Sequence, residues 1–443
     1  MPTQIGVGSQ GVWSPFWVQN GAAFGAGTND LAEQANMTYV PNATLAHPYY
    51  HATTNPNAHW VKIDMNTAGV TKIGNVGDAD FAATAPDATR RWGHVLRFTF
   101  RKDGNPTSLA RWLNVTGGGA YFEMDTDGTL ISHPNVNAGV YRAISAIGNN
   151  APYEIEVWYI PKDASGANLV GRTGFLAVQV VVRIDTNPGG TPALTTLMNV
   201  LAEGASAVTA SHLIMEVGDS SARGAVNFYY SNIYGPNWED ADAPYGAVRV
   251  EEYIPTADYD SGFTLGSFAD WDEAGPDDIT TRIQQATYAA SANELSETVA
   301  NGAGGTSGIT ASDAVICAST VTRAVLLASD SKGSSVLFYA SIHDGTTLLK
   351  KASSPGLTNW AYRTRFWRTD PSAAAWGQAA LANIKIGASY DTVVATPSNR
   401  SFSACRAYIA WVKDGEEYPA VPAIVRGDPP FPRRPIRNLL VTR

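Results

Sequence analysis

The stretch HVLRFTFR at residues 94–101 indicates the fold class of this chain. Its apolar residues Leu96, Phe98 and Phe100 alternate with more polar ones, so they project to one face of an extended strand. Similar stretches recur along the chain at intervals of about 8 to 15 residues, separated by clusters of Gly, Pro, Asn and Asp. This pattern of short strands and turns is typical of antiparallel β-sandwiches and barrels.

The length and composition of the chain indicate how many such units it contains. The 443 residues are 44% hydrophobic and only 16% charged, so the chain can bury sizeable cores. At roughly 150–200 residues per domain, this length exceeds one sandwich and fits two. We therefore predict an all-β fold of two tandem antiparallel β-sandwiches, jelly-roll or concanavalin-like, with an extended C-terminal arm. The predicted boundaries are 1–240 and 241–413 for the sandwiches and 414–443 for the arm.

Individual strands can be placed from the same alternation. Residues 153–160 place Ile155, Val157 and Tyr159 on one face and Glu154, Glu156 and Trp158 on the other. Residues 174–184 are apolar on both faces, as a central strand covered on both sides would be. Further strands are predicted at 226–234, 247–255, 323–330, 335–345, 362–370, 381–387 and 403–412, with a hairpin turn at 331–334.

Helix signals are few. Residues 192–204 place Leu194, Leu197 and Leu201 at near-helical spacing, and residues 280–299 are rich in helix-favouring side chains. We predict a short helix at each place.

The last stretch, 414–443, differs from the rest of the chain in composition. Its prolines interrupt any strand ladder and favour extended chain, and its arginines alternate with apolar residues. Two interpretations remain open, a floppy tail and an anchor strapped over a neighbouring subunit. The apolar residues Leu439, Leu440 and Val441 favour the anchor, because simple tails rarely end in apolar residues.

Charge and hydropathy exclude several partners. The net charge of −9 argues against nucleic-acid binding, which requires a basic surface. The N-terminus lacks the basic and apolar regions of a secretory signal, and no apolar run approaches the ~20 residues that span a bilayer. We expect no membrane insertion, and synthesis in a cytoplasm or release by a route without a cleaved signal.

The two cysteines, Cys317 and Cys405, exclude a disulfide-rich scaffold and a four-cysteine metal site. Both lie in strand-like apolar runs. They are either small buried hydrophobic residues or a bridge between neighbouring strands.

The most enzyme-like feature is the string Glu123-Met-Asp125-Thr-Asp127-Gly128. On a strand, carboxylates two residues apart share a face at about 7 Å, a separation that glycoside hydrolysis can use. The string resembles the catalytic strand of the concanavalin-like glycoside hydrolases, Glu-x-Asp-x-x-Glu, but Gly128 stands where the acid carboxylate should be. The same residues also form an ordinary hairpin turn leading into a strand. We therefore assign no catalytic residue here.

Other polar groups are interpreted as structural. Glu154 and Glu156 share a strand face that we predict to be solvated, and His343 begins a turn. An acidic loop has the oxygen ligands that calcium prefers, but its spacing fits no calcium loop. Three histidines share a loop whose prolines disfavour the helical spacing that one metal would need. The acidic loop contains Asp270, Asp272, Glu273, Asp277 and Asp278, and the histidines are His47, His51 and His59.

No nucleophile elbow, phosphate loop or dinucleotide fingerprint occurs in the sequence. We predict no catalytic, cofactor-binding or metal-binding residue.

Aromatic residues are abundant, with twelve Trp and nineteen Tyr. In loops, such side chains stack on sugars and anchor protein interfaces, whereas in sandwiches they also fill cores. We assign no single one to a ligand. A cluster in the first sixty residues contains Trp13, Trp17, Tyr49, Tyr50 and Trp60.

Residues 244–412 resemble structural proteins of tailed bacteriophages. The best match is a Trp-x-x-Asp-Pro-x-x-x-x-Trp turn formed by Trp367, Asp370, Pro371 and Trp376. This resemblance implies a virion location, homo-oligomers and no enzymatic step.

We therefore expect a non-enzymatic virion protein, on the tail or decorating the capsid. It would be assembled in the host cytoplasm, contact other virion subunits and have host surface glycans as a further partner. Two alternatives stay open, a dedicated glycan-binding adhesin and a polysaccharide-cleaving enzyme of the concanavalin-like type.

Overall fold

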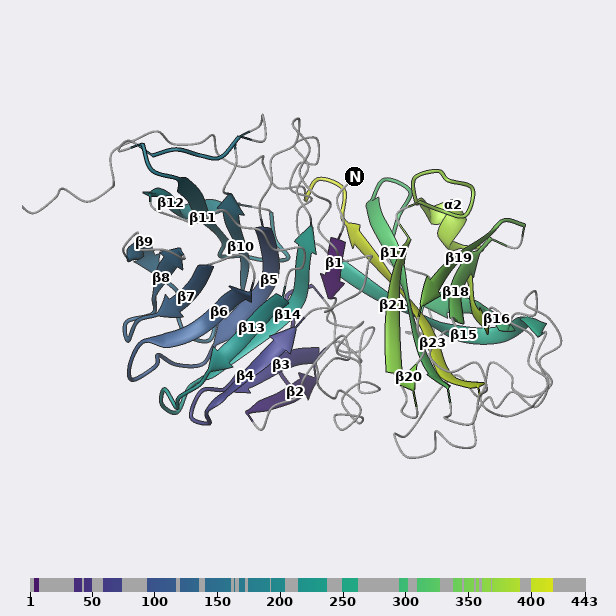
Figure 1. Cartoon of the computed structure of the whole chain (residues 1–443), viewed down its shortest axis with the longest axis horizontal. Coiled ribbons are helices and arrows are strands. Elements are labelled where there is room, and N and C mark those ends of the chain that lie inside the picture. The colour runs from purple at the N-terminus through teal and green to yellow at the C-terminus, as the bar shows by residue number, and fades with distance from the viewer. Residues whose placement is uncertain are drawn as a thin grey trace, which may run out of the picture.

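The computed structural model shows an all-β, antiparallel chain, as predicted (Figure 1). The described strands form three sheets, two from residues 4–236 and the third from residues 249–412. The structure describes residues 4–7, 36–41, 44–49, 59–73, 94–116, 120–134, 140–160, 163, 167–171, 174–191, 193–203, 214–236, 249–261, 295–301, 309–326, 338–344, 346–353, 356–357, 361–367, 369–390 and 400–416.

The first and second sheets have eight and six described strands. The first has the order β12-β11-β10-β5-β14-β3-β2, with β1 also paired to β14; the second has the order β4-β13-β6-β7-β8-β9. The strands of the first sheet are β12 (Thr195–Glu203), β11 (Ala177–Asp185), β10 (Tyr153–Ile160), β5 (His94–Lys102), β14 (Asn227–Pro236), β3 (His59–Asp64), β2 (Met37–Pro41) and β1 (Gln4–Val7). Those of the second are β4 (Gly69–Ile73), β13 (Ile214–Asp219), β6 (Ala110–Thr116), β7 (Ala120–Met124), β8 (Thr129–Pro134) and β9 (Tyr141–Ala146).

An aromatic core joins the first two sheets face to face. Phe98 and Phe100 of β5 lie 5.7 and 5.5 Å from the ring of Trp112 on β6, and Trp112 contacts Phe122 on β7. The Tyr230 hydroxyl of β14 donates a hydrogen bond of 2.5 Å to the Trp112 carbonyl. All five side chains are buried, and each contributes on the order of 2 kcal/mol through removal of apolar area from water.

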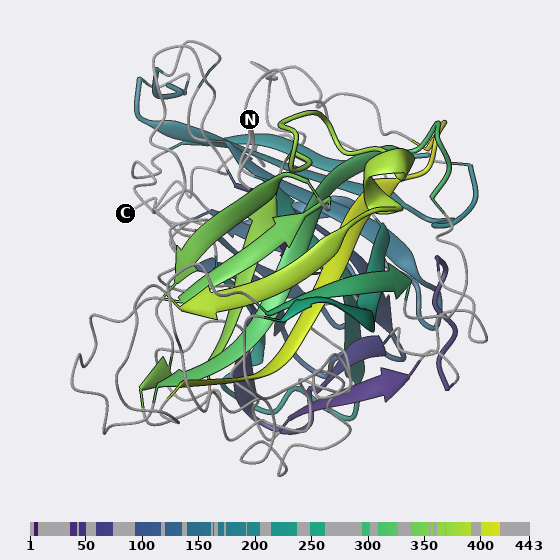
Figure 2. The same ribbon diagram turned by 90° about the vertical axis from the view of Figure 1, so that its right-hand side faces the viewer.

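The third sheet is one continuous hydrogen-bonded path that folds over itself (Figure 2). Strand β22 contacts β23 and β18 contacts β17 across its interior, although neither pair is adjacent in the sheet. Its order is β19-β18-β22-β16-β15-β23-β17-β20, with β21 also paired to β17, and only the short β17–β20 pair is parallel. The strands are β19 (Leu348–Ser353), β18 (Phe338–His343), β22 (Lys385–Tyr390), β16 (Leu295–Asn301), β15 (Arg249–Ser261), β23 (Arg400–Val412), β17 (Ala314–Leu326), β20 (Gly356–Leu357) and β21 (Ala361–Trp367).

The tryptophan turn, on which the sequence resemblance rests, packs into the core of this third sheet. Trp376 Nε1 donates to the Trp367 carbonyl at 2.7 Å, and Trp367 Nε1 donates to Thr320 Oγ1 at 3.1 Å. Asp370 Oδ1 accepts the Ala374 amide at 2.8 Å and so holds the turn. Both indoles are buried in the core, so these residues act in folding. A single helical turn, α2 (Gln378–Leu381), follows.

One helix prediction is wrong. Residues 195–203 form strand β12, which pairs with β11 along its length. Leu197, Met198 and Val200 are all buried, so the segment is covered on both faces and the leucine spacing reflects two apolar faces. In the other predicted helix, residues 295–299 belong to β16, and residues 280–294 lie outside the described residues.

The strand register excludes a bridge between the two cysteines within the chain. Cys317 on β17 lies opposite Ala410 on β23, whereas Cys405 on β23 lies opposite Thr322. The two positions are therefore five residues apart along the strand pair, about 16 Å at 3.3 Å per residue. A disulfide requires Cα atoms within about 7 Å.

Several sequence predictions fall outside the described residues, namely the 331–334 turn, the acidic loop at 270–278, Trp13, Trp17, Tyr50, His51 and the arm beyond residue 416. The predicted turn after His343 is confirmed, because Asp344 Oδ1 accepts the amides of Thr346 and Thr347 at 2.8 Å. Within the described part of the chain, no helix has the length and apolar character needed to cross a membrane.

Two glycines with positive φ provide a matched test of this fold. Gly128 has φ +85° and a Cβ there would lie 2.7 Å from the Ile147 carbonyl oxygen, whereas Gly174 has φ +82° and open space around it. We expect Gly174→Ala to cost about 1–2 kcal/mol from the backbone conformation alone, and Gly128→Ala to cost roughly twice as much because a backbone oxygen must also move. Urea unfolding measures both; equal losses would contradict the tight approach at Gly128.

Candidate functional site

The carboxylate string of residues 123–128 forms the hairpin between β7 and β8. The Gly128 amide donates to the Asp125 carbonyl at 2.9 Å, and Asp127 Oδ1 accepts the Thr129 amide at 2.8 Å. Gly128 occupies the left-handed position that the turn requires. The hairpin interpretation of this string is therefore confirmed, and the missing acid carboxylate is a turn glycine.

The two aspartates of the string are held in their ionised forms. A hydrogen bond from Arg142, at 2.5 Å, is the main cause that lowers the pKa of Asp125. The backbone amide of Thr129 lowers the pKa of Asp127 in the same way. A glycosidase proton donor needs a raised pKa, so neither aspartate has the environment of that acid.

Glu123 belongs to a different group, on the outer face of the second sheet. In the register, Arg111 on β6 lies opposite Glu123 on β7, and Tyr121 on β7 lies opposite His133 on β8. Phe122 lies between Tyr121 and Glu123 on β7 and points to the aromatic core. Tyr121 and Glu123 therefore point outward. We call Arg111, Tyr121, Glu123 and His133 the outer patch.

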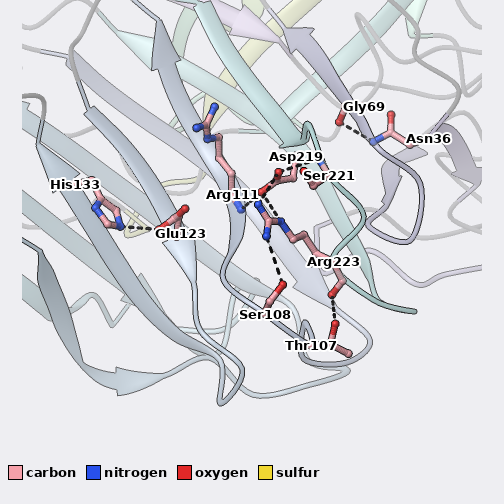
Figure 3. Close-up of polar contacts among 10 residues, drawn as sticks. All are labelled: Asn36, Gly69, Thr107, Ser108, Arg111, Glu123, His133, Asp219, Ser221 and Arg223. Atoms are coloured by element: carbon pink, nitrogen blue, oxygen red, sulfur yellow. Dashed lines mark hydrogen bonds and ion pairs between the residues drawn. The ribbon is translucent and has the colours of Figure 1, made fainter.

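The side chains of the outer patch hold one another in place. His133 Nε2 lies 2.7 Å from Glu123 Oε2, and each of these side chains is 17% exposed (Figure 3). The His133 ring stacks on Tyr121 at 4.4 Å between centroids, with planes 7° apart. The Arg111 guanidinium carbon lies 5.1 Å from the centroid of the same Tyr121 ring. Polar groups thus reach water from three neighbouring strands in a fixed arrangement.

A second layer of contacts fixes the backbone beneath Arg111. Asp219 Oδ2 accepts the Arg111 amide at 2.9 Å, and the same carboxylate pairs with Arg223 at 3.0 Å (Figure 3). Burial would raise the pKa of Asp219, but Arg223 and the amides of Arg111 and Ser221 lower it. The Arg223 carbonyl in turn accepts a hydrogen bond from the Thr107 hydroxyl at 3.1 Å. This network ties β6 to the end of β13.

The outer face of the first sheet has a different character. Glu154 and Glu156 share one face of β10, as predicted, but they are 1% and 0% exposed, so the prediction of a solvated face is wrong. Arg97 on β5 and Arg183 on β11 both form ion pairs with Glu156. A buried Arg–Glu–Arg triad therefore lies across three neighbouring strands, with the Trp158 indole donating to the same carboxylate.

Glu154 is held as the neutral acid beside this triad. Burial is the main cause that raises the pKa of Glu154 to about 8, and Asp185, opposite it in the register, adds to the effect. Arg97 and hydrogen bonds from Thr99, at 3.0 Å, and Tyr49, at 3.4 Å, oppose it. The neighbouring Glu156 has the opposite behaviour. Burial would raise its pKa, but Arg97 and Arg183 lower it.

Residues 44–49 lie against this buried face. Trp60 Nε1 donates to the Leu45 carbonyl at 3.0 Å, and His47 lies 4.8 Å from the Trp60 ring. Burial lowers the pKa of His47 to about 3, so this histidine is neutral. Of the two other histidines of that predicted group, His59 begins β3. Within the described ranges, no three His, Cys, Asp or Glu side chains are placed to hold a metal ion.

Tyr49 also connects the first sheet with the third. The Arg249 guanidinium, from the first residue of β15, lies 5.1 Å from the Tyr49 ring and 5.3 Å from the Trp411 ring of β23. Arg249 forms an ion pair of 2.7 Å with Glu416, just beyond β23. A cation between two aromatic rings thus links the two halves of the chain.

Sequence reasoning singled out Glu123 but missed Arg111, Tyr121 and His133. Each stands at an outward position of a short alternating strand, which is a detectable signal. Their meeting depends on the register of β6, β7 and β8 and on a bulge between Arg111 and Leu113. The alternation within a single strand does not show how that strand is aligned with its neighbours.

Comparisons with known proteins find solved structures of low similarity. No family model and no curated protein matches the chain. Among solved structures, a sialidase from Trypanosoma rangeli is 13% identical with a TM-score of 0.27, over 46% of this chain and 26% of the sialidase. A galectin from Caenorhabditis elegans is 14% identical with a TM-score of 0.20, over 34% of this chain and 93% of the galectin.

A carbohydrate esterase from the Shiga toxin-encoding bacteriophage phi24B is 14% identical with a TM-score of 0.26, over 49% of this chain and 95% of the esterase. The chain spans about a quarter of the sialidase. At these TM-scores no activity, ligand or partner is transferred from these proteins.

The buried triad makes a sharp stability prediction. Glu156→Gln removes the buried carboxylate that Arg97 and Arg183 share, so we expect a loss of about 3–5 kcal/mol in the free energy of unfolding. The matched change Glu123→Gln, at a partly exposed pair, should cost no more than about 1 kcal/mol. Chemical denaturation of both variants measures the difference. Similar losses would show that the triad is not a buried charge centre.

Glu154 gives the chain a pH-dependent stability. The folded state keeps this proton up to about pH 8, whereas the unfolded state loses it near pH 4.5. Its stabilising contribution is therefore complete below pH 4.5 and falls as pH rises towards 8, by up to about 1.4 kcal/mol per pH unit. We expect Glu154→Gln to gain stability relative to the natural chain between pH 5.5 and pH 7.5, assayed by urea unfolding. A constant difference between the two proteins would rule out the raised pKa.

Proposed function

We propose that this chain is a non-enzymatic, glycan-binding structural protein of a bacteriophage particle, in which the outer patch binds the glycan. The observation that carries the proposal is the outer patch itself, a partly exposed array of carboxylate, imidazole, guanidinium and phenol groups on three neighbouring strands.

The chemistry of the outer patch suits a hydroxyl-rich ligand. Sugar hydroxyls both donate and accept hydrogen bonds, and the patch offers an acceptor in Glu123 and donors in Arg111 and His133. Charge-assisted hydrogen bonds of this kind are stronger than neutral ones. The groups are already ordered by their mutual contacts and by Asp219, so little side-chain entropy is lost when a ligand binds.

The non-enzymatic part of the proposal is supported by the protonation states. On the exposed face, Asp125 and Asp127 have lowered pKa values. The carboxyl group with the raised pKa, Glu154, is 1% exposed on another sheet. The carboxyl pair of a glycosidase, in which one member has a raised pKa, therefore does not occur at an accessible place among the described residues.

The virion location and the contacts with other virion subunits rest on the sequence resemblance of residues 244–412. The best-matched segment of this resemblance is the tryptophan turn with Trp367 and Trp376. Both indoles are buried in the core, so the turn stabilises the fold and is not a binding site. In this proposal the third sheet is the assembly half, and the second sheet presents the ligand face.

Substitution of Tyr121 tests the glycan site. Tyr121→Ala removes the ring that both His133 and Arg111 contact, so we expect glycan affinity to fall at least about tenfold. The matched control is Tyr259→Ala, because Tyr259 is 43% exposed on β15 and also lies under a cation, Lys385, at 4.7 Å. Binding would be found on a glycan array and quantified by titration calorimetry.

Two results would contradict the proposal. One is the absence of binding across a broad glycan array, or binding that Tyr259→Ala abolishes and Tyr121→Ala leaves unchanged. The other is release of reducing ends from a polysaccharide that Glu123→Gln abolishes, which would establish the enzyme instead.

A further inference from the structure

Among the described residues, the Arg111 guanidinium forms no direct ion pair with a carboxylate. The nearby carboxylates each contact another side chain, Glu123 that of His133, Asp125 that of Arg142 and Asp219 that of Arg223. No described carboxylate pairs with the Arg111 guanidinium, which lies over the Tyr121 ring although Glu123 stands directly opposite in the register. The Arg111 guanidinium therefore has no carboxylate in direct contact on this face of a chain whose net charge is −9.

The Arg111 side chain is also poorly supplied with hydrogen-bond acceptors. Its Nε atom is shielded from solvent and has no acceptor among the described residues. Its backbone amide is bound by Asp219, while its guanidinium points away from the Asp219–Arg223 pair (Figure 3). A fixed backbone, a ring that supports the guanidinium and the two Nη groups, for which the described residues offer no acceptor, together form a receptor for an acceptor from outside the chain.

A planar carboxylate is the acceptor that this group fits best. Guanidinium presents its donors in a rigid fork, which matches the two oxygens of a carboxylate and forms two parallel hydrogen bonds. A neutral hydroxyl satisfies only one such donor and leaves the charge uncompensated. The overall negative charge of the chain disfavours general attraction of polyanions, so selection of an anion must come from this local group.

We infer that the ligand of the outer patch is an acidic saccharide whose carboxylate pairs with Arg111, while Glu123 and His133 bind hydroxyls of the same or the next sugar. This inference rests on the proposed glycan-binding function and specifies its ligand class.

The test compares acidic and neutral sugars that are otherwise alike. The probes are 3′-sialyllactose with lactose, and trigalacturonic acid with its carboxyl-reduced counterpart, titrated against the full chain. We expect an acidic probe to bind and its neutral partner to bind at least about tenfold more weakly. Arg111→Gln should lower the affinity for the acidic probe by about 10- to 100-fold, because a charge-assisted bidentate contact is lost.

Control variants separate this effect from folding and from general charge. Arg142→Gln removes an equal charge from the same sheet, but Arg142 is already paired with Asp125 and 49% exposed, so we expect less than about a threefold change. Arg111→Lys keeps the charge and loses the fork, and should give an intermediate affinity. Thermal unfolding of each variant confirms that the fold is retained.

The outcomes distinguish this inference from the function on which it rests. Equal affinity for acidic and neutral probes, lowered by Tyr121→Ala but unaffected by Arg111→Gln, would overturn the acidic ligand and leave the glycan site standing. Equal losses in Arg111→Gln and Arg142→Gln would also overturn it, because general charge would then explain the binding. Binding of neither class would overturn both proposals.

Discussion

The packing of β5 and β14 against β6 and β7 determines which side chains of the first two sheets face outward. Phe98, Phe100 and Tyr230 meet Trp112 and Phe122 in one buried aromatic layer. Because side chains alternate along a strand, the neighbours of each residue in this layer have side chains that point to the opposite face of the sheet. The outward direction of the side chains in the Arg–Glu–Arg triad and in the outer patch follows from the packing of this aromatic layer.

The two outer faces then differ in their access to water. On the first sheet, Arg97 and Arg183 are buried and share the carboxylate of Glu156, and these contacts offset part of the cost of removing the charges from solvent. On the second sheet, Glu123 and His133 remain partly exposed. Charges in the first setting specify structure, whereas charges in the second can still exchange water for a ligand.

A series of side-chain contacts connects the first sheet with the third. Glu154 accepts the Tyr49 hydroxyl, Arg249 lies over the Tyr49 and Trp411 rings, and Glu416 pairs with Arg249. Glu416 is the last described residue before the arginine-rich stretch at the end of the chain. Glu416 is therefore fixed at the junction between the first and third sheets.

The sequence by itself determined strands such as β5 and β10, because the two-residue alternation of each is a local property of the segment. It also determined the turn at Gly128 and the central strand β11, all of whose residues are buried. Only the tertiary structure decided the register, and register brought Arg111, Tyr121 and His133 together and kept Cys317 apart from Cys405. It also decided burial. The alternation of Glu154 and Glu156 with apolar residues shows that they share a face, but whether water or protein covers that face depends on segments far away in the chain. For the same reason residues 195–203 became a strand, since hydrogen bonds to β11 outweigh the weak local preference for a helix.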